Sequence, residues 1–142
     1  MRIFLAEDNP ADVYLLREAL GVDQDTQLEL LVVQDGEEAL DFVYRRGKFV
    51  SVPNPDLVVL DLNLPKSDGN DVLKAIRETE DLRDVPVVIL TSSDSPKDRD
   101  AAERLGANGY ITKPSDLDEF LSLGDQLRAF VACGSNEAHA NA

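Results

Sequence analysis

Carboxylates, hydroxyls and one lysine follow the short apolar runs of this sequence, at the points where those runs end. Glu7 and Asp8 follow the first run, Asp61 follows the third, and Thr91 and Lys113 follow the fourth and fifth. Clustered carboxylates cannot all stay ionised without a compensating cation. A carboxylate beside a hard cation and a lysine can act as a nucleophile toward phosphorus. This pattern predicts transfer of a phosphoryl group to Asp61.

The oxygen-rich set predicts a site for a hard divalent cation, Mg²⁺ or Mn²⁺. We expect Asp8 and Asp61 to be direct ligands, Glu7 to act through water, and Asn63 to contribute its backbone carbonyl. The cation and Lys113 would neutralise charge on the phosphoryl oxygens. The sequence has one cysteine and one histidine, which argues against zinc.

Each of these residues, taken singly, has a structural explanation. An acidic residue after a strand is usually a helix cap or a solvated loop residue, and a lone lysine is usually on the surface. The prediction depends on their coincidence, because four of five strand ends carry residue types that one reaction needs.

The elements that must position these residues alternate along the chain. Five apolar runs are expected to be strands: 3–6, 28–33, 57–60, 87–90 and 110–111. Helix starts are indicated at Asn9-Pro10, Asp35, Asp68-Gly69, Ser95-Pro96 and Ser115. Five strands and five helices in alternation predict an α/β fold with a doubly wound parallel sheet. In such sheets ligands bind outside the carboxyl ends of the strands.

Size and charge limit the function further. The 142 residues form one domain with a net charge of −14, which disfavours binding to nucleic acid. No apolar run approaches the ~20 residues needed to span a membrane. We expect no targeting segment and a cytoplasmic location. A folded domain is predicted over 1–131, followed by a flexible tail over 132–142.

The motifs together resemble the receiver domain of two-component response regulators, over residues 2 to about 131. They are Glu7-Asp8-Asn9, Leu60-Asp61-Leu62-Asn63-Leu64-Pro65, Asp68-Gly69, Leu90-Thr91-Ser92 and Tyr110-Ile111-Thr112-Lys113-Pro114. The resemblance implies a flavodoxin-like fold with strand order 2-1-3-4-5. Leu64 and Ser92 depart from residues common in the family, but neither change removes a functional group.

The family also implies a role for each site residue. Asp61 would be the phosphoacceptor, Glu7 and Asp8 the acidic pair, Asn63 the backbone ligand, Thr91 the switch hydroxyl and Lys113 the site lysine. Tyr110 would be a switch aromatic, or alternatively a half-buried core residue. Lys113-Pro114 resembles the position of a cis peptide in the family.

Four further segments show a narrower resemblance: Arg46-Gly47-Lys48-Phe49, Glu7-Asp8-Asn9-Pro10-Ala11-Asp12, Thr91-Ser92-Ser93 and Gly106-Ala107-Asn108. They are similar to stand-alone regulators that work with phytochrome-like histidine kinases. This resemblance implies a sensor histidine kinase as partner and a separate downstream protein, since no effector domain is expected. Homodimerisation through the last helix–strand–helix face is also implied, with Phe120, Leu123 and Phe130 as candidates.

Two other functions stay open from the sequence. One is a phosphorylation-independent interaction module, although members of that kind typically lack one of the key residues. The other is a phosphatase with an aspartyl nucleophile, which usually has a second acid where this chain has Asn63. We expect a phosphoacceptor, with at most slow self-dephosphorylation, rather than an enzyme.

Overall fold

Five parallel strands form one sheet in the computed structural model, which describes residues 1–22, 24 and 27–140. The strands are β1 (Arg2–Ala6), β2 (Glu29–Val33), β3 (Leu57–Leu60), β4 (Val87–Thr91) and β5 (Gly109–Thr112). Their spatial order is β2-β1-β3-β4-β5, and every neighbouring pair is parallel. The predicted fold class and strand order are confirmed.

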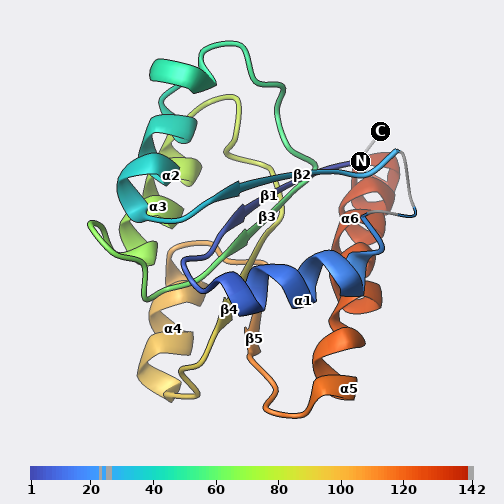
Figure 1. The fold of residues 1–142 in the computed structure, drawn as a ribbon. Coiled ribbons are helices and arrows are strands. Elements are labelled where there is room, and N and C mark those ends of the chain that lie inside the picture. The colour runs from blue at the N-terminus through green and yellow to red at the C-terminus, as the bar shows by residue number, and fades with distance from the viewer. Residues whose placement is uncertain (23, 25–26, 141–142) are drawn as a thin grey trace.

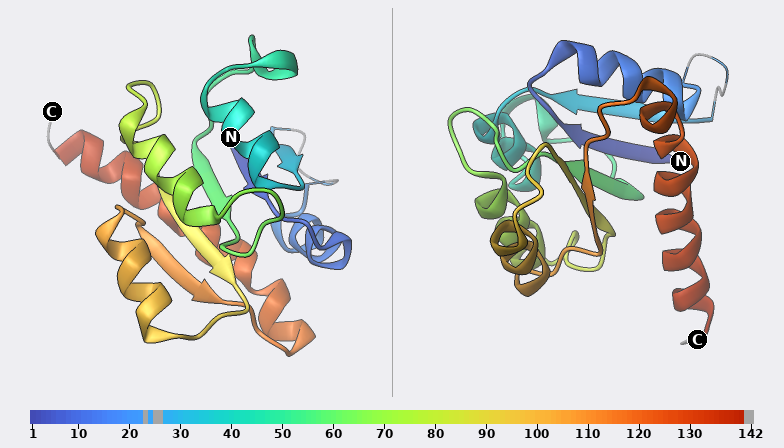
Figure 2. Two further views of the ribbon diagram at one scale, coloured as in Figure 1. Left: turned by 90° about the vertical axis from the view of Figure 1, so that its left-hand side faces the viewer. Right: turned by 90° about the horizontal axis from the view of Figure 1, so that it is seen from below.

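Helices cover both faces of the sheet (Figures 1 and 2). The helices are α1 (Pro10–Leu20), α2 (Gly36–Val43), the 3₁₀ turn η1 (Gly47–Phe49), α3 (Gly69–Glu78), α4 (Pro96–Arg104), α5 (Leu117–Leu121) and α6 (Leu123–Ala140). One core lies under α2, α3 and α4, and a second lies under α1, α5 and α6. Alternate residues of β1 enter the two cores, with Phe4 in the first and Leu5 in the second.

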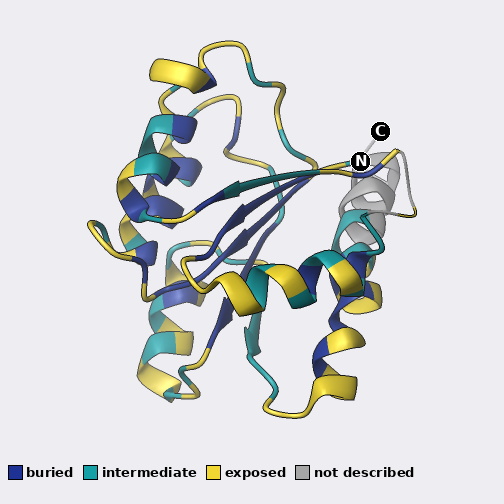
Figure 3. Cartoon of the chain, viewed as in Figure 1, coloured by how far each residue is buried: buried dark blue, intermediate teal, exposed yellow. Residues whose placement is uncertain are grey.

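Burial follows strand position in the sheet (Figure 3). Every residue of β3 and β4 is buried, because these central strands are covered on both faces. The edge strands β2 and β5 are mostly half-buried. The uniform apolar runs therefore marked the central strands correctly.

Side-chain caps fix the helices on which the site depends. Asn9 Oδ1 accepts from the backbone N–H of Ala11, and Asp35 Oδ1 accepts from that of Glu38. Asp68 caps α3 through Asn70 N. These three predicted starts are confirmed, and so is the start of α4 at Ser95-Pro96, although the Ser95 side chain makes no capping hydrogen bond.

The end of the chain differs from the prediction. A helix does follow Ser115, but its cap is Asp116, and Ser122 divides the one expected helix into α5 and α6. Helix α6 continues to Ala140 through most of the segment expected to be a tail, and residues 141–142 lie outside the described ones. The flexibility of 132–142 stays a prediction.

Two residues suggested for a dimer interface are in the core. Phe120 is 4% exposed and Leu123 is 1% exposed, and both pack in the core under α1. The ring of Phe130 is half-buried and covers Gly109 of β5. The first two are therefore unavailable to a partner without unpacking the domain.

Arg77, at the end of α3, ties two loops together. Its guanidinium donates to the backbone carbonyls of Arg83, Val85 and Gly106, and to Asn108 Oδ1. Asn108 Oδ1 also accepts from Val87 N at 2.8 Å. Burial lowers the Arg77 pKa from its ordinary value, with Asp84 opposing the change. The α3–β4 and α4–β5 loops are thus linked through hydrogen bonds to the same Arg77 guanidinium.

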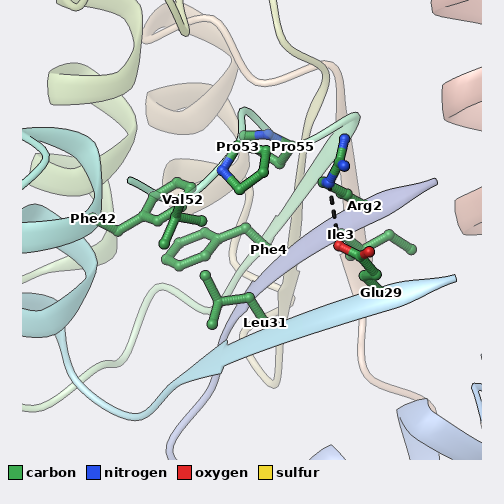
Figure 4. A pocket seen from close by; sticks show the side chains of 9 residues that line it. All are labelled: Arg2, Ile3, Phe4, Glu29, Leu31, Phe42, Val52, Pro53 and Pro55. Atoms are coloured by element: carbon green, nitrogen blue, oxygen red, sulfur yellow. Dashed lines mark hydrogen bonds and ion pairs between the residues drawn. The ribbon is translucent and has the colours of Figure 1, made fainter. Parts of the chain in front are cut away.

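A small cavity lies at the amino ends of β1 and β2 (Figure 4). The rings of Phe4 and Phe42 stack there at 3.9 Å, and Arg2 pairs with Glu29 at its mouth. Its lining is Arg2, Ile3, Phe4, Glu29, Leu31, Phe42, Val52, Pro53 and Pro55. None of the predicted site residues is among them, so the chemistry belongs to the opposite edge of the sheet.

Candidate functional site

The predicted site residues meet at the carboxyl edge of the sheet. Ala6 of β1 pairs with Leu60 of β3, so Glu7 and Asp61 leave neighbouring strands side by side. Asp61 N donates to Ala6 O at 3.1 Å, which continues the pairing to the site itself. On the other side, Thr91 of β4 pairs with Thr112 of β5, next to Lys113.

The Lys113 ammonium contacts three carboxylates at once. Its Nζ lies 2.6 Å from Glu7 Oε1, 2.9 Å from Asp12 Oδ2 and 3.1 Å from Asp61 Oδ2. The Lys113 side chain is only 9% exposed, so these pairs are little screened by solvent. Three ammonium hydrogens thereby find three acceptors.

The charges of Lys113 and Glu7 respond in opposite ways to this environment. Burial disfavours the Lys113 charge, but the hydrogen bonds to Asp12 and Glu7 outweigh it and raise the Lys113 pKa above its ordinary value. Burial raises the pKa of Glu7 to about 7, the nearby Asp61 adds to that rise, and the Lys113 hydrogen bond opposes it. Lys113 therefore stays charged at neutral pH, while Glu7 can hold a proton.

Asp12 belongs to this cluster, although the sequence analysis gave it no role. It lies in the first turn of α1, and Asn9 caps that turn by accepting from Asp12 N. The signal was its place one helical turn after the acidic pair, in a helix that starts at the same edge of the sheet.

Three carboxylates are close enough to share a cation. Oxygens of Glu7, Asp8 and Asp61 lie within 4.8 Å of one another. With Asp12, the cluster has four carboxylates and one ammonium, which leaves negative charge to be balanced. An all-oxygen set of this kind fits a hard divalent cation such as Mg²⁺ or Mn²⁺.

The two acidic neighbours differ in what they offer. Both Glu7 oxygens already have partners, Lys113 Nζ and the backbone N–H of Asn9. Asp8 is exposed, and its carboxylate pairs with no group in the described part of the chain. Asp8 is therefore the more accessible of the two carboxylates, and the expected roles, direct binding by Asp8 and binding through water by Glu7, stay predictions.

Asp61 is held by the loop that follows it. Its Oδ1 accepts from Asn63 N at 3.1 Å, and the domain leaves Asp61 5% exposed. Gly69 of α3 packs against its backbone, because an added Cβ there would lie 2.4 Å from Asp61 O. The glycine of the Asp68-Gly69 motif is thus needed for close approach.

Hydroxyl groups occupy the other side of the site. Thr91 is fully buried, and its Oγ1 accepts from Asn63 Nδ2 at 3.4 Å and from Ser93 N at 3.3 Å. Tyr110 is half-buried, with its hydroxyl donating to Ser93 O at 2.9 Å and the Arg99 guanidinium 4.9 Å from its ring centre. Ser93 therefore links Thr91 to Tyr110.

The backbone beside Lys113 differs from the family expectation. No peptide bond within the described ranges is cis, so Lys113-Pro114 is trans here. Lys113 N still donates to Thr91 O at 2.7 Å, which continues the β4–β5 pairing and aims the lysine at Asp61.

An open groove gives access to the site between α1 and the β5–α5 loop. Lys113 and Asp12 are the two members of the charged cluster that line it. Its lining is Asn9, Asp12, Leu15, Ser92, Lys113, Pro114, Ser115, Asp116, Leu117 and Phe120.

A doubly wound parallel sheet with an acidic cluster, a buried threonine and a lysine at its carboxyl edge defines a receiver-type signalling domain. Residues 3–123 match the family model for the response regulator receiver domain. The chain belongs to this family, as its motifs indicated.

Similar proteins are response regulators, and some of the similar solved structures are phytochrome response regulators. The chain is 38% identical over 128 residues to response regulator Rcp1 of Synechocystis sp., covering 90% of this chain and 86% of Rcp1. It superposes on the phosphorylated cyanobacterial phytochrome response regulator RcpA with a TM-score of 0.86 and 37% identity, over 92% and 93% of the two chains. The Mn²⁺-bound form of Rcp1 gives a TM-score of 0.83 and 37% identity, over 91% and 92%.

Membership of the receiver-domain family defines the general function of the chain. Accepting a phosphoryl group is the general function of receiver domains, which bind a divalent metal and are not classical enzymes. Among the residues that the structure describes, no helix could cross a membrane.

Proposed function

We propose that this chain is a single-domain response regulator that accepts a phosphoryl group on Asp61 from a sensor histidine kinase. The observation that carries the proposal is the placement of Asp61: its Oδ2 lies 3.1 Å from the Lys113 ammonium, and its carboxylate belongs to the acidic cluster with Glu7 and Asp8. Such a carboxylate is oriented and kept close to positive charge, as a nucleophile toward phosphorus must be.

In the transfer, an Asp61 carboxylate oxygen forms a bond to phosphorus as the P–N bond of a phosphohistidine breaks. The electron pair of that bond stays with the histidine nitrogen, and Asp61 becomes an acyl phosphate. The Lys113 ammonium stabilises negative charge on the phosphoryl oxygens. A divalent cation, proposed to be Mg²⁺ held by Asp8, Asp61 and the Asn63 carbonyl with Glu7 through water, supplies further neutralisation when bound.

The side of the site that carries Thr91 and Tyr110 would respond to the phosphoryl group on Asp61. Oγ1 of Thr91 accepts two hydrogen bonds, and its own proton is used in none among the described residues, so it can donate to a phosphoryl oxygen. The phosphoryl group carries roughly −1.5 to −2 charges if phosphoserine is a guide, in place of the single charge of the Asp61 carboxylate. Movement of Thr91 would loosen Ser93 and Tyr110, and with them the surface around α4 and β5. That surface is the proposed contact with a downstream protein.

The partners follow from the same proposal. The kinase would be phytochrome-like, with its phosphohistidine approaching along the groove beside Lys113. The receiver domain would occupy 1–131 in the cytoplasm, and a homodimer would use exposed residues of its last helix–strand–helix face. Slow self-dephosphorylation would depend on Ser92 and Ser93, next to Thr91.

One experiment tests the proposed acceptor. The protein is incubated with acetyl phosphate and Mg²⁺, and its mass is measured. We expect one added phosphoryl group that is absent with Asp61→Asn and absent with chelator. Thr91→Ala is expected to retain the adduct but to lose the accompanying change in amide exchange of α4 and β5.

Two results would contradict the proposal. An unmodified protein, also when supplied with a phosphorylated phytochrome-like kinase, would favour a phosphorylation-independent module. Rapid multiple turnover of phosphate esters would favour a phosphatase.

A further inference from the structure

The loop between β3 and α3, residues 61–68, carries both Asp61 and Asn63 and is anchored to two helices. At one anchor Gly69 N donates to Leu62 O at 3.1 Å, next to the start of α3. At the other, Gly36 N donates to Pro65 O at 2.8 Å, at the start of α2. In Figure 1 this loop passes beside the start of α2, which contributes no residue to the site itself.

The contact with α2 leaves no space at Gly36. A Cβ added there would lie 2.4 Å from Ser67 O and 2.5 Å from Ser67 Cβ. Ordinary contact begins at 3.4 Å, so a methyl group would require a displacement of about 1 Å. The glycine is therefore needed because the loop backbone rests directly on the helix.

A strained residue confirms that the loop is held in place. Lys66 has φ +70°, a left-handed conformation that is unfavourable for a residue with a Cβ. Such conformations persist where the surrounding structure imposes them. Here Pro65 and Ser67 on either side of Lys66 contact Gly36, and Lys66 Nζ lies 3.5 Å from Asp35 Oδ2, the cap of α2.

If a side chain added at Gly36 overfills its contact with Ser67, we expect the β3–α3 loop to move rather than helix α2. Helix α2 is fixed by Ala39, Phe42 and Val43, each at most 1% exposed, and Phe42 stacks on Phe4 of β1. The loop is exposed at Pro65, Lys66 and Asp68. A displacement at Ser67 would be passed along four residues to Asn63, whose N–H donates to Asp61 Oδ1.

We infer that the start of α2 is a positioning element for the acceptor site: Gly36 sets the β3–α3 loop and thereby the affinity of the site for its divalent cation. The inference rests on the proposed function, because it takes Asp61 and Asn63 as cation ligands. Groups that orient ligands from outside a metal site typically change affinity 10–100-fold when altered. A displacement of about 1 Å exceeds the ~0.5 Å within which such groups must be held.

The test is Mn²⁺ binding to the full chain, measured from free Mn²⁺ by electron paramagnetic resonance. We expect Gly36→Ala to raise the Mn²⁺ Kd about tenfold, the lower end of the range for altered outer partners. Amide exchange at Asn63 should quicken in the same variant. Neither measurement requires phosphoryl transfer.

The matched control is Gly124→Ala in α6. A Cβ at Gly124 would lie 2.0 Å from Ala19 O, a comparable clash at the end of α1 remote from the site. It should lower the free energy of unfolding without changing the Mn²⁺ Kd. If Gly36→Ala does not fold, Ser67→Gly decides the matter, since it removes the Cβ that faces Gly36, creates no clash and should raise the Kd by a smaller factor.

The outcomes separate this inference from the proposed function. An unchanged Kd in folded Gly36→Ala, or in Ser67→Gly where the former does not fold, would overturn the inference, as would an equal change in Gly124→Ala. Absence of Mn²⁺ binding by the wild-type protein would also overturn it. Mn²⁺ binding that depends on Gly36, in a protein that accepts no phosphoryl group, would support the inference and contradict the proposed function.

Discussion

Glu7, Asp61 and Lys113 are held by ion pairs of 2.6–3.1 Å, whereas Thr91 and Tyr110 on the other side of the same site are held by neutral hydrogen bonds of 2.9–3.4 Å. Breaking a buried ion pair typically costs 3–5 kcal/mol, because it leaves a buried charge without a partner. A neutral hydrogen bond contributes about 1 kcal/mol. The charged side of the site (Glu7, Asp61 and Lys113) is thus fixed and defines what can bind. The neutral side (Thr91 and Tyr110) can rearrange at low cost in free energy.

The largest expected effect breaks the charged side. Lys113→Met removes the shared partner of Glu7, Asp12 and Asp61, and should lower the free energy of unfolding without metal by about 3 kcal/mol at pH 8. Saturating Mg²⁺ should restore part of the loss, because it screens the same carboxylates. Urea unfolding with and without Mg²⁺ measures both.

Lys66→Met is the matched control for that prediction. Its ion pair with Asp35 is exposed, with the lysine side chain 61% accessible, so the change should be below about 1 kcal/mol. Equal losses in the two variants would show that the charged side is no more tightly held than the surface.

A smaller effect follows from the Glu7 pKa of about 7. Because the folded-state pKa is raised above 4.5, the folded protein binds the Glu7 proton more tightly than the unfolded chain does. Glu7 therefore favours the metal-free fold at low pH and ceases to do so as pH rises through about 7. Deprotonation also adds a charge beside the cation site, so Mn²⁺ affinity should rise about tenfold between pH 6 and 8.

Mn²⁺ titrations at three pH values check this, with Glu7→Gln expected to flatten the dependence. A wild-type affinity that is constant from pH 6 to 8 would mean that Glu7 stays ionised throughout.

The smallest expected effect concerns the neutral side. Tyr110→Phe removes the 2.9 Å hydrogen bond to Ser93 O while keeping the ring beside Arg99, and should cost about 1 kcal/mol in urea unfolding. The phosphoryl adduct should form as before. Tyr44→Phe, on an exposed tyrosine, should change neither quantity. A Tyr110 variant that lost the adduct would remove the distinction between the two sides.

Most of the fold could be predicted, because buried parallel strands have a distinctive sequence pattern. The runs at 57–60 and 87–90 are almost wholly β-branched or leucine and became central strands within one residue of the predicted limits. The site followed from one topological rule, since parallel strands bring Glu7, Asp61 and Lys113 to the same edge.

The sequence could not show which way a side chain points or which segment packs against it. Asp12 differs from Glu18, the other acidic residue of α1, in lying in the first turn and pointing at Lys113, which depends on where the helix starts. The apolar stripe of the last helix identified Phe120 but not whether a partner or α1 would cover it. Gly36 was visible as part of a helix start, yet its contact with Ser67 joins segments about thirty residues apart.

Arg77 adds a mechanical consequence. It fastens Gly106, just after the last turn of α4, to the α3–β4 loop, whereas the first turn of α4 is attached through Ser93 Oγ and Asp98, near the acceptor. If the attachment of the first turn is released while Gly106 stays held, α4 can tilt but cannot shift along its axis. We therefore expect any displacement of α4 on phosphorylation to be a tilt about its C-terminal end, smallest at Gly106 and largest beside Ser93.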